Sequence, residues 1–233
     1  MNARGVVFDI GGVLELTPAT GWRRTWESRL ALAPGDIDRV LGPVWEAGAV
    51  GAITESGVRT EIMTRLGLGD TGADAFLADL WDEYLGAPNT ALIAFVRELP
   101  HRFPGCRLGV LSNSFTGARE REDAAYGFGA LFARLVYSHE CGLLKPDPRA
   151  YALVCDGLGL RPGDCLFVDD LPANTEAAEA AGMRAALFTG NEAVTAAITR
   201  HLGREGSGSS EGSRGSGNSR SSQGSQSSQG SGA

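Results

Sequence analysis

One lysine lies among acidic residues that could handle a phosphorylated substrate. Lys145 is the only lysine in the 233 residues, and the other twenty basic side chains are arginine. Asp9 ends a short apolar segment, and Asp169 with Asp170 ends another. A compact ammonium among carboxylates can offset charge on phosphate oxygens, which the arginine fork does with a different geometry. A bias toward arginine would by itself explain a single lysine, but the acidic segments on either side of Lys145 in the sequence indicate a site for a phosphorylated substrate.

The polar residues around these acids have chemical uses of their own. Ser112 and Asn113 end a further apolar run, where a hydroxyl, an amide and backbone N–H groups can hold an anion, although both are also common turn residues. The carboxylates of Asp169 and Asp170 are hard oxygen ligands that suit Mg²⁺. They precede Pro172, so they also fit the start of a helix, and capping and metal binding can coexist.

The elements that must position these residues alternate along the chain. Apolar strands are predicted at residues 5–9, 107–112, 135–138, 165–169 and 185–188. Helices are predicted at 90–102, 116–126, 148–158, 172–181 and 191–202. Continuous apolar runs are typical of a parallel sheet that is buried on both faces. The sequence therefore predicts an α/β fold, a doubly wound Rossmann-like parallel sheet.

A long insertion separates the first two strands. Four amphipathic stretches, at 22–32, 37–47, 56–66 and 73–85, predict a helical cap over the carboxyl edge of the sheet. Asp36, Thr54 and Asp70 are candidate helix starts. The predicted domains are a core of residues 1–16 and 87–203, a cap of residues 17–86, and a disordered tail, rich in Gly, Ser and Gln, at 204–233.

Bulk properties exclude several classes of partner. The formal net charge of −7 disfavours a nucleic-acid or anionic membrane surface. No apolar run is long enough to span a membrane, and the first residues do not resemble a signal peptide. The four cysteines have no paired metal-site spacing, which favours buried thiols. We expect a cytoplasmic protein; the sequence does not indicate its oligomeric state.

Four stretches in order carry a family resemblance. They are residues 8–14 around Asp9, residues 111–113, residues 138–148 around Lys145, and residues 167–174 around Asp169 and Asp170. The chain resembles the haloacid dehalogenase (HAD) superfamily of aspartate-nucleophile hydrolases. The similarity extends over residues 5–190 and is greatest to the subgroup with a helical cap after strand one. That subgroup includes the phosphatase domain of soluble epoxide hydrolases and bacterial sugar-phosphate phosphatases.

The resemblance implies a Mg²⁺-dependent phosphatase that acts on a small phosphorylated metabolite, with sugar phosphates as one candidate class. By this resemblance Asp9 is the nucleophile and forms an aspartyl-phosphate, and Lys145 stabilises charge at phosphorus. Ser112 and the backbone of Asn113 bind a phosphoryl oxygen. The expected metal ligands are Asp9, the carbonyl of Gly11 and Asp170, with Asp169 in or near the coordination shell.

Gly11 departs from the family pattern. Most related phosphatases have a second aspartate at this position, which serves as general acid and base, a function typically worth about 10²–10⁴-fold in rate. Glu15 is the nearest other carboxylate and could serve, although a residue of a flap is the favoured interpretation. The missing aspartate keeps an alternative open: a catalytically weak or silent HAD-like protein that binds a phosphorylated metabolite or a partner.

The sequence disfavours two other reactions known in the superfamily. Dehalogenases of the superfamily have a less acidic motif in place of Asp169 and Asp170, so dehalogenation of 2-haloacids is disfavoured. Phosphonate cleavage through a cap lysine is excluded because the predicted cap contains no lysine.

A cluster of aromatic and basic residues in the predicted cap has two interpretations. Its members, which could face substrate, are Trp22, Arg23, Arg24 and Trp26. The favoured interpretation is an aromatic stripe that packs against the cap interior, with the arginines in solvent. His101 and His201 are interpreted as ordinary surface residues.

Overall fold

A five-stranded parallel β-sheet is the centre of the fold. The computed structural model describes residues 3–203, so the predicted tail at 204–233 lies outside the described residues. The strands are β1 Gly5–Phe8, β4 Arg107–Ser112, β5 Arg134–Tyr137, β6 Cys165–Asp169 and β7 Arg184–Leu187. Their spatial order is β5-β4-β1-β6-β7, and every neighbouring pair is parallel.

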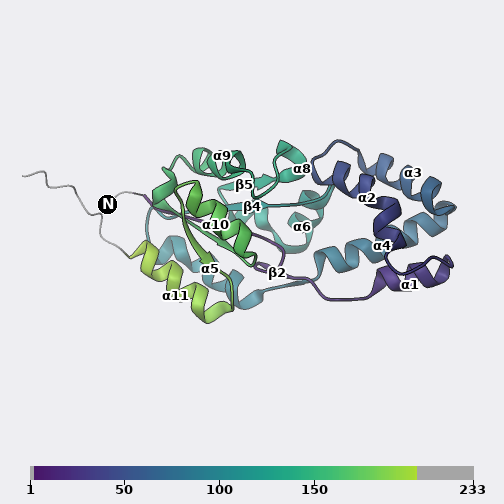
Figure 1. Ribbon diagram of the computed structural model, residues 1–233. Helices are drawn as coiled ribbons and strands as arrows, with labels where there is room; N and C mark the ends of the chain where they lie inside the picture. The colour runs from purple at the N-terminus through teal and green to yellow at the C-terminus, as the bar shows by residue number, and fades with distance from the viewer. Residues whose placement is uncertain (1–2, 204–233) are drawn as a thin grey trace, which may run out of the picture.

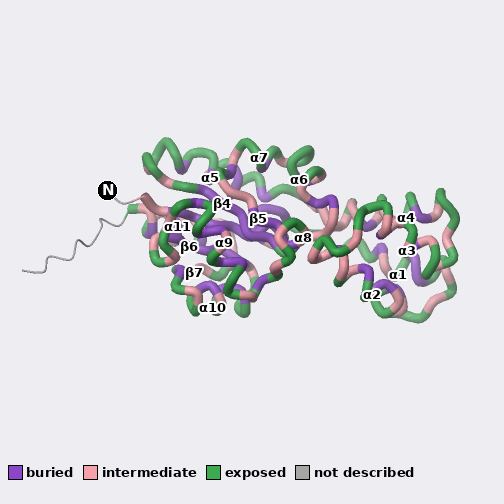
Figure 2. Tube along the Cα trace, turned by 90° about the horizontal axis from the view of Figure 1, so that it is seen from above, coloured by how far each residue is buried: buried purple, intermediate pink, exposed green. Residues whose placement is uncertain are grey.

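The apolar composition of the strands explains their central position. Every residue of β1 and β6 is buried, because helices cover both faces of the sheet (Figure 2). In the register, Phe8 of β1 pairs with Val110 of β4 and with Val168 of β6. The predicted doubly wound α/β fold is confirmed, and the predicted bounds of β4 and β6 match the structure.

Two groups of helices form the outer layers of this core (Figure 1). One apolar cluster joins the sheet to α5 (Thr90–Arg102), α7 (Phe128–Leu131) and α11 (Asn191–Leu202). Another joins the opposite face to α9 (Pro148–Leu158) and α10 (Pro172–Ala180). The remaining helical segments of the core are α6 (Ala118–Tyr126), α8 (Ser138–Cys141) and the 3₁₀ turn η1 (Pro162–Asp164).

Four helices form a separate bundle at one end of the molecule, here called the cap (Figure 1). They are α1 Trp22–Arg29, α2 Asp36–Ala49, α3 Glu55–Leu66 and α4 Asp70–Leu85. The cap has its own apolar interior, in which the rings of Trp22 and Trp26 pack 5.0 Å and 5.2 Å from the ring of Phe76. No helix within residues 3–203 combines the length and apolar character needed to cross a bilayer.

The three predicted helix starts in the cap all lie where a helix begins. Thr54 caps α3, and its side chain accepts a hydrogen bond from Gly57 N. Asp36 and Asp70 are instead the first helical residues of α2 and α4, after the glycines that hold the N-cap positions. Acidic residues in the first turn of a helix stabilise it through the helix dipole, which is why an aspartate signals a helix start at this position as well as at the N-cap.

The cap is joined to the core by a short ribbon and by a close backbone contact. β2 (Glu15–Leu16) pairs antiparallel with β3 (Ala87–Pro88), so the two connecting segments run side by side; neither strand was predicted. On the other side, Thr116 N donates to Gly48 O at 3.0 Å. A Cβ at Gly48 would overlap the ring of Phe115, so glycine permits this close approach.

Candidate active site

The candidate site lies at the carboxyl edge of the sheet, where three adjacent strands end. Asp9 directly follows β1, Ser112 is the last residue of β4, and Asp169 is the last residue of β6. Because β1 lies between β4 and β6 and all three are parallel, these ends are neighbours. In open α/β sheets, ligands bind beyond the carboxyl ends of the strands.

Lys145 lies between two of these acids. Its Nζ is 2.8 Å from Asp9 Oδ1 and 2.7 Å from Asp169 Oδ2. The Lys145 side chain is 1% exposed and the Asp169 side chain is fully buried. An ammonium buried in this way is stabilised only through its charged partners, and loss of one partner leaves a buried charge unpaired. Residues that are far apart in the sequence therefore form one charge network.

Asn113 holds the segment that carries Lys145. Its Oδ1 accepts a hydrogen bond from Lys145 N at 2.7 Å, and its Nδ2 donates to the Lys145 carbonyl at 2.9 Å. This reciprocal pair joins the loop after β4 to the loop before α9. The expectation from the sequence concerned only the backbone of Asn113, so the positioning of Lys145 by its side chain is an additional finding.

Asp169 is engaged by protein donors on both carboxylate oxygens. Its Oδ1 accepts hydrogen bonds from Leu171 N at 2.9 Å and from Asn174 Nδ2 at 3.0 Å. Its Oδ2 accepts from Lys145 Nζ at 2.7 Å and from Asn174 Nδ2 at 3.1 Å. A carboxylate held by this many donors is fixed in orientation. Asp169 is therefore well placed to orient the Lys145 ammonium.

Asp9, Asp169 and Asp170 form an acidic cluster suited to a divalent cation. Each offers an oxygen within 4.8 Å of an oxygen of the others. Burial and the Asp169 charge raise the pKa of Asp170. Burial also raises the pKa of Asp9, and the Asp169 charge adds to this rise, whereas the Lys145 ammonium opposes it. Crowded carboxylates disfavour one another's ionisation, and hard oxygen donors in this arrangement fit Mg²⁺.

A tight turn after Asp9 brings Glu15 beside Gly11. The N–H groups of Val13, Leu14 and Glu15 all donate to the carbonyl of Ile10, at 3.1, 2.9 and 2.9 Å. A Cβ placed on Gly11 would have one neighbour within 4 Å outside the flanking residues, Glu15 Oε2 at 3.9 Å. The space that an aspartate would occupy at position 11 is therefore open, and it adjoins a carboxylate supplied from four residues further along.

The surroundings of Glu15 favour its protonated form. Glu15 is 2% exposed, its Oε2 accepts a hydrogen bond from Thr17 Oγ1 at 2.7 Å, and its Oε1 has no partner among residues 3–203. Burial raises the pKa of Glu15 to about 7, and the nearby Asp9 charge contributes to the rise. A carboxyl group with a pKa near the working pH can donate a proton and later accept one.

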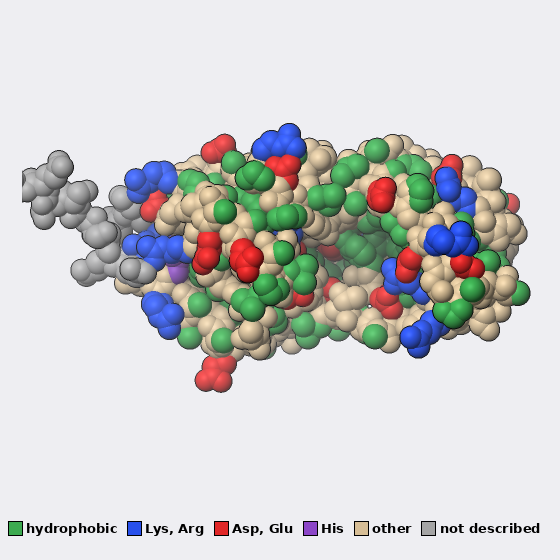
Figure 3. Space-filling model, in the orientation of Figure 1, with side chains coloured by type: hydrophobic (Ala, Val, Ile, Leu, Met, Phe, Trp, Pro, Cys, Tyr) green, Lys and Arg blue, Asp and Glu red, His purple; other side chains and the backbone are tan. Residues whose placement is uncertain are grey.

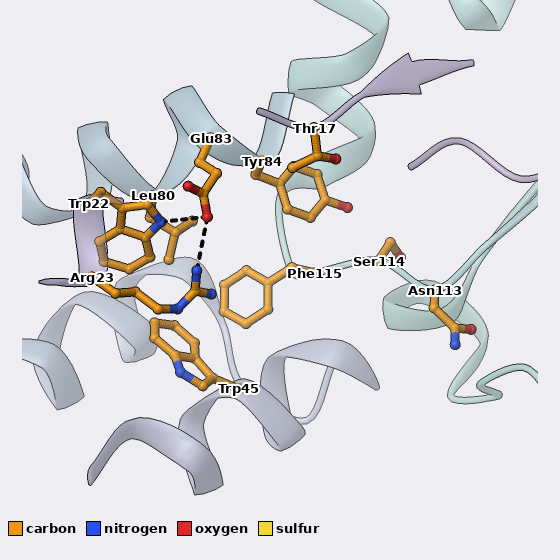
Figure 4. Close-up of a pocket in the computed structure, with 10 residues that line it drawn as sticks. All are labelled: Thr17, Trp22, Arg23, Trp45, Leu80, Glu83, Tyr84, Asn113, Ser114 and Phe115. Atoms are coloured by element: carbon orange, nitrogen blue, oxygen red, sulfur yellow. Dashed lines mark hydrogen bonds and ion pairs between the residues drawn. The ribbon is translucent and has the colours of Figure 1, made fainter. Parts of the chain in front are cut away.

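Two adjoining chambers lie between the core and the cap, where the surface is hollowed (Figure 3). The small chamber, of about 100 Å³, is lined by Ile10, Gly11, Glu15, Thr17, Tyr84, Ser112, Asn113 and Glu122. The aromatic chamber, of about 290 Å³, is lined by Thr17, Trp22, Arg23, Trp45, Leu80, Glu83, Tyr84, Asn113, Ser114 and Phe115 (Figure 4). The chambers share Thr17, Tyr84 and Asn113, so a bound molecule can extend from one into the other.

Comparisons with known proteins decide the family. A family model for haloacid dehalogenase-like hydrolases matches residues 3–182. This chain belongs to the haloacid dehalogenase-like hydrolase family. It is 30% identical over 204 residues to the protein CbbY of Rhodobacter capsulatus, in a match that covers 80% of this chain and 86% of that protein.

Two further relatives are consistent with this assignment. A phosphatase of Mycobacterium tuberculosis is 34% identical over 105 residues, a match that covers 44% of this chain and only 48% of that protein. A predicted HAD-like family hydrolase from Porphyromonas gingivalis has a solved structure with 25% identity and a TM-score of 0.69. That comparison covers 87% of this chain and 99% of the other chain. The α/β core and the cap together therefore match a family member of known structure.

Several residues of the site gave little or no signal in the sequence. Glu122 is 2% exposed and accepts a hydrogen bond from Tyr137 OH at 2.7 Å, although it lies in a run of charged residues. Its position four residues after Ala118 and four before Tyr126 was the available signal, because such spacing places all three on one helix face. No comparable pattern identified Tyr84 of the cap as a lining residue.

Two interpretations of side chains need revision. His201 was expected at the surface but is 4% exposed, because its ring packs at the end of α11 and its Nε2 lies 3.1 Å from Gly5 O. Trp22 does pack in the cap interior as part of an aromatic stripe, yet with Arg23 it also lines the aromatic chamber. The two interpretations of that cluster were therefore not mutually exclusive.

Proposed function

We propose that this HAD-like hydrolase is a Mg²⁺-dependent phosphomonoesterase that uses Asp9 as nucleophile. The observation that carries the proposal is the Lys145 ammonium, buried 2.8 Å from Asp9 Oδ1 at the strand edge whose next residues, Ile10 and Gly11, line the small chamber. A positive charge beside a carboxylate reduces repulsion when that carboxylate approaches a phosphate ester. The matched mycobacterial relative, a phosphatase, supports the same class of reaction.

We assign the parts of the chain as follows. Residues 1–16 and 87–203 form the catalytic core, and residues 17–86 form a substrate cap. The support is that α1–α4 have an apolar interior separate from the clusters on the sheet, and that the aromatic chamber lies between the two parts. Ser112 and the backbone of Asn113 line the small chamber, where they would bind a phosphoryl oxygen.

The metal would be held by Asp9, the Gly11 carbonyl and Asp170. The three clustered carboxylates are hard donors of the kind Mg²⁺ prefers, whereas Asp169 is already engaged by Lys145 and Asn174. We therefore place Asp169 next to the metal ligands, with the function of orienting Lys145. When bound, the metal neutralises charge on phosphoryl oxygens and aligns the ester with the nucleophile.

The chemistry proceeds in two displacements at phosphorus. A carboxylate oxygen of Asp9 attacks, the bond to the leaving oxygen breaks, and an aspartyl-phosphate forms. Lys145 stabilises the negative charge that develops during this step. Water then attacks the same phosphorus, the bond to Asp9 breaks, and phosphate is released.

Glu15 would supply the proton transfers that Gly11 cannot. In the first displacement its carboxyl group protonates the leaving oxygen, and in the second its carboxylate takes a proton from the attacking water. The support is the open space at Gly11 next to Glu15 Oε2 and the pKa of about 7 that burial imposes on Glu15. The same chamber thus contains a nucleophile loop and a proton donor.

A phosphate-release assay tests the proposal. Purified protein with p-nitrophenyl phosphate should turn over with Mg²⁺, and turnover should disappear with EDTA. Asp9→Asn should lower kcat/KM by more than about 10³-fold, because the nucleophile is lost. Asp156→Asn, which alters an exposed acid on α9, is the matched control and should leave turnover unchanged.

Other outcomes identify the alternatives. Failure to hydrolyse any phosphomonoester, with binding of phosphate analogues intact, would indicate a silent binding protein. Halide release from 2-haloacids without metal would indicate a dehalogenase. The location of Glu15 beside Gly11 argues against the first alternative, and the acidic cluster of Asp9, Asp169 and Asp170 argues against the second.

A further inference from the structure

We propose that the aromatic chamber selects phosphomonoesters of flat, apolar alcohols over sugar phosphates. This inference rests on the proposed phosphatase function and specifies its substrate class. The chamber adjoins the small chamber through Thr17, Tyr84 and Asn113, so an ester with its phosphate near Asp9 extends its alcohol portion toward the cap. The lining of the aromatic chamber then determines which alcohol portions bind.

Aromatic rings dominate the wall of this chamber. Figure 4 shows the rings of Trp22, Trp45 and Phe115 around the Arg23 guanidinium, with Tyr84 on the side of the small chamber. The Trp45 and Phe115 rings pack edge to face, with centroids 5.7 Å apart. Rings held by their neighbours in this way present flat faces and edges at low entropic cost, which favours a flat apolar ligand.

The charged side chains of the chamber are already paired with one another. Arg23 Nη1 lies 2.9 Å from Glu83 Oε1, and Arg23 Nε lies 3.0 Å from Asp38 Oδ1. Glu83 also accepts hydrogen bonds from Trp22 Nε1 at 3.1 Å and from Thr20 N and Oγ1 at 2.9 and 2.6 Å. Because Glu83 accepts four protein hydrogen bonds, it has little capacity left for a sugar hydroxyl.

The polar groups on the core side are also engaged. Both functional atoms of the Asn113 amide bind the backbone of Lys145. Ser114 Oγ lies 2.6 Å from His139 Nδ1 and 3.3 Å from Ser138 Oγ. A sugar has several hydroxyl groups, and each one that loses water without gaining a partner weakens binding. The chamber therefore disfavours a polyhydroxylated alcohol portion and favours one that needs no partners.

The volume of the chamber limits the size of the group. An apolar cavity of about 150 Å³ is large enough to hold benzene. The aromatic chamber, at about 290 Å³, has room for one or two fused rings. Leu80 adds an apolar surface on the same wall. We therefore expect arylmethyl phosphates with one or two fused rings to be better substrates than phosphates of aliphatic polyols of similar size.

A substrate panel with matched leaving groups tests this selectivity. Benzyl phosphate and 2-naphthylmethyl phosphate are compared with glucose 6-phosphate and glycerol 3-phosphate in the presence of Mg²⁺. All four release primary alcohols, so differences in kcat/KM report binding rather than the reactivity of a phenol. We expect kcat/KM for the two arylmethyl esters to exceed that for glucose 6-phosphate by about 100-fold or more.

A cap variant links this preference to the chamber. Trp45→Leu should lower kcat/KM for benzyl phosphate by about 10-fold, mainly by raising KM, because a ring contact is lost. It should change the value for glucose 6-phosphate by less than about 3-fold. Met63→Leu is the control: Met63 is also a partly buried apolar side chain of the cap but is absent from the chamber lining, so the preference should persist. Circular dichroism verifies that both variants are folded.

Equilibrium binding separates this inference from the proposed function. Benzylphosphonate, which has no ester bond to hydrolyse, should quench the fluorescence of the wild-type cap tryptophans, and this titration gives its Kd. Displacement of benzylphosphonate by glucose 6-phosphate gives the Kd of the sugar phosphate, which should be the higher of the two. If phosphomonoesters are hydrolysed but kcat/KM for the sugar phosphates equals or exceeds that for the arylmethyl esters, the inference fails and the phosphatase proposal stands. If nothing is hydrolysed, the phosphatase proposal fails, and the binding comparison alone decides: tighter benzylphosphonate binding supports the chamber's selectivity, and equal or weaker binding overturns it.

Discussion

The core and the cap use charge in opposite ways. In the core, one lysine is buried between carboxylates, with its side chain 1% exposed. In the cap, ion pairs such as Arg59 with Asp70 and Asp74, at 2.9 and 2.8 Å, involve acids that are 80% and 64% exposed. Exposed pairs contribute little to stability, whereas a buried charge depends on its partners. The core therefore holds a buried cation between carboxylates, whereas the Arg59 network of the cap lies at the surface.

The core and the cap also differ in which bulky or charged side chains they contain. All four tryptophans of the chain lie within residues 22–81, in the cap, and the only lysine lies in the core. Aromatic rings provide large contact surfaces, and a lysine provides a compact charge. The tryptophans and the lysine therefore place ring surface and buried charge in separate parts of the molecule, and the proposed function depends on this division between selectivity and reaction.

The largest effect that would test this division is expected from Glu15. Glu15→Gln should lower kcat by about 10²–10⁴-fold with the fold intact, because the proton donor is lost. Adding Gly11→Asp should restore part of the activity, since a Cβ at Gly11 has no neighbour closer than 3.9 Å. In the wild type, activity should fall as the pH rises above about 7, where Glu15 loses its proton.

The control variant for Glu15→Gln changes a glutamate of the cap. Glu46→Gln changes an exposed acid on α2 and should leave kcat unchanged. Steady-state kinetics across pH 5–9 provide the measurement. Full activity of Glu15→Gln, or an unaltered basic limb in its pH profile, would show that another group transfers the proton.

A second comparison concerns stability. Lys145→Met should reduce the free energy of unfolding at pH 8 by about 3–5 kcal/mol, because Asp9 and Asp169 then face each other without a counter-charge. Arg59→Met, in the exposed cap network, should leave the melting temperature nearly unchanged. Urea unfolding of both variants without metal measures the contrast. Equal destabilisation would contradict the proposed difference between buried and exposed pairs.

The smallest expected effect is a pH dependence of stability that differs in sign between the regions. Burial raises the pKa of Glu122 in the core from 4.5 to about 7, so its stabilising contribution is complete below pH 4.5 and is lost as the pH rises through 7. Arg59 lowers the pKa of Asp74 in the cap, so that contribution is present at neutral pH and is lost in acid.

Urea titrations at pH 5, 6, 7 and 8 test the core term. In the wild type the free energy of unfolding should decrease as the pH rises toward 7. Glu122→Gln should make this slope less steep, by at most about 1.4 kcal/mol per pH unit. Asp74→Asn, the cap counterpart, should leave that decline unaltered. A wild-type stability that rises with pH between 5 and 7, with no change in the Glu122 variant, would refute the assignment.

The sequence predicted the core well because its rules are local. Strands β4 and β6 are apolar runs that end in polar residues, and parallel strands bring their carboxyl ends to one edge. The meeting of Asp9 and Asp169 follows from that topology, whereas Lys145 lies in the loop before α9 and was placed with them through the family resemblance. The pairing of Lys145 with the Asn113 side chain was not predictable, because it depends on two loops whose relative position no pattern records.

The connections between core and cap were predicted poorly because they are short segments without a repeating pattern. β2 and β3 have two residues each, too few for a periodic signal. The place of Glu15 depends on the turn around the Ile10 carbonyl, which sequence spacing does not define. His201 was misplaced because a histidine near the end of a helix has no signature that distinguishes a buried ring from an exposed one.

The β2–β3 ribbon has a mechanical consequence. The chain crosses between the two regions twice, and the crossings are hydrogen-bonded to each other, with Glu15 on one of them. Asn89 ties the same place to the core, since its N donates to Leu14 O at 2.8 Å and its Nδ2 to Val13 O at 2.9 Å. A swing of the cap must bend this two-stranded hinge. Glu15 therefore lies on the connection itself, so any change in the angle between cap and core would move its carboxyl group relative to Gly11.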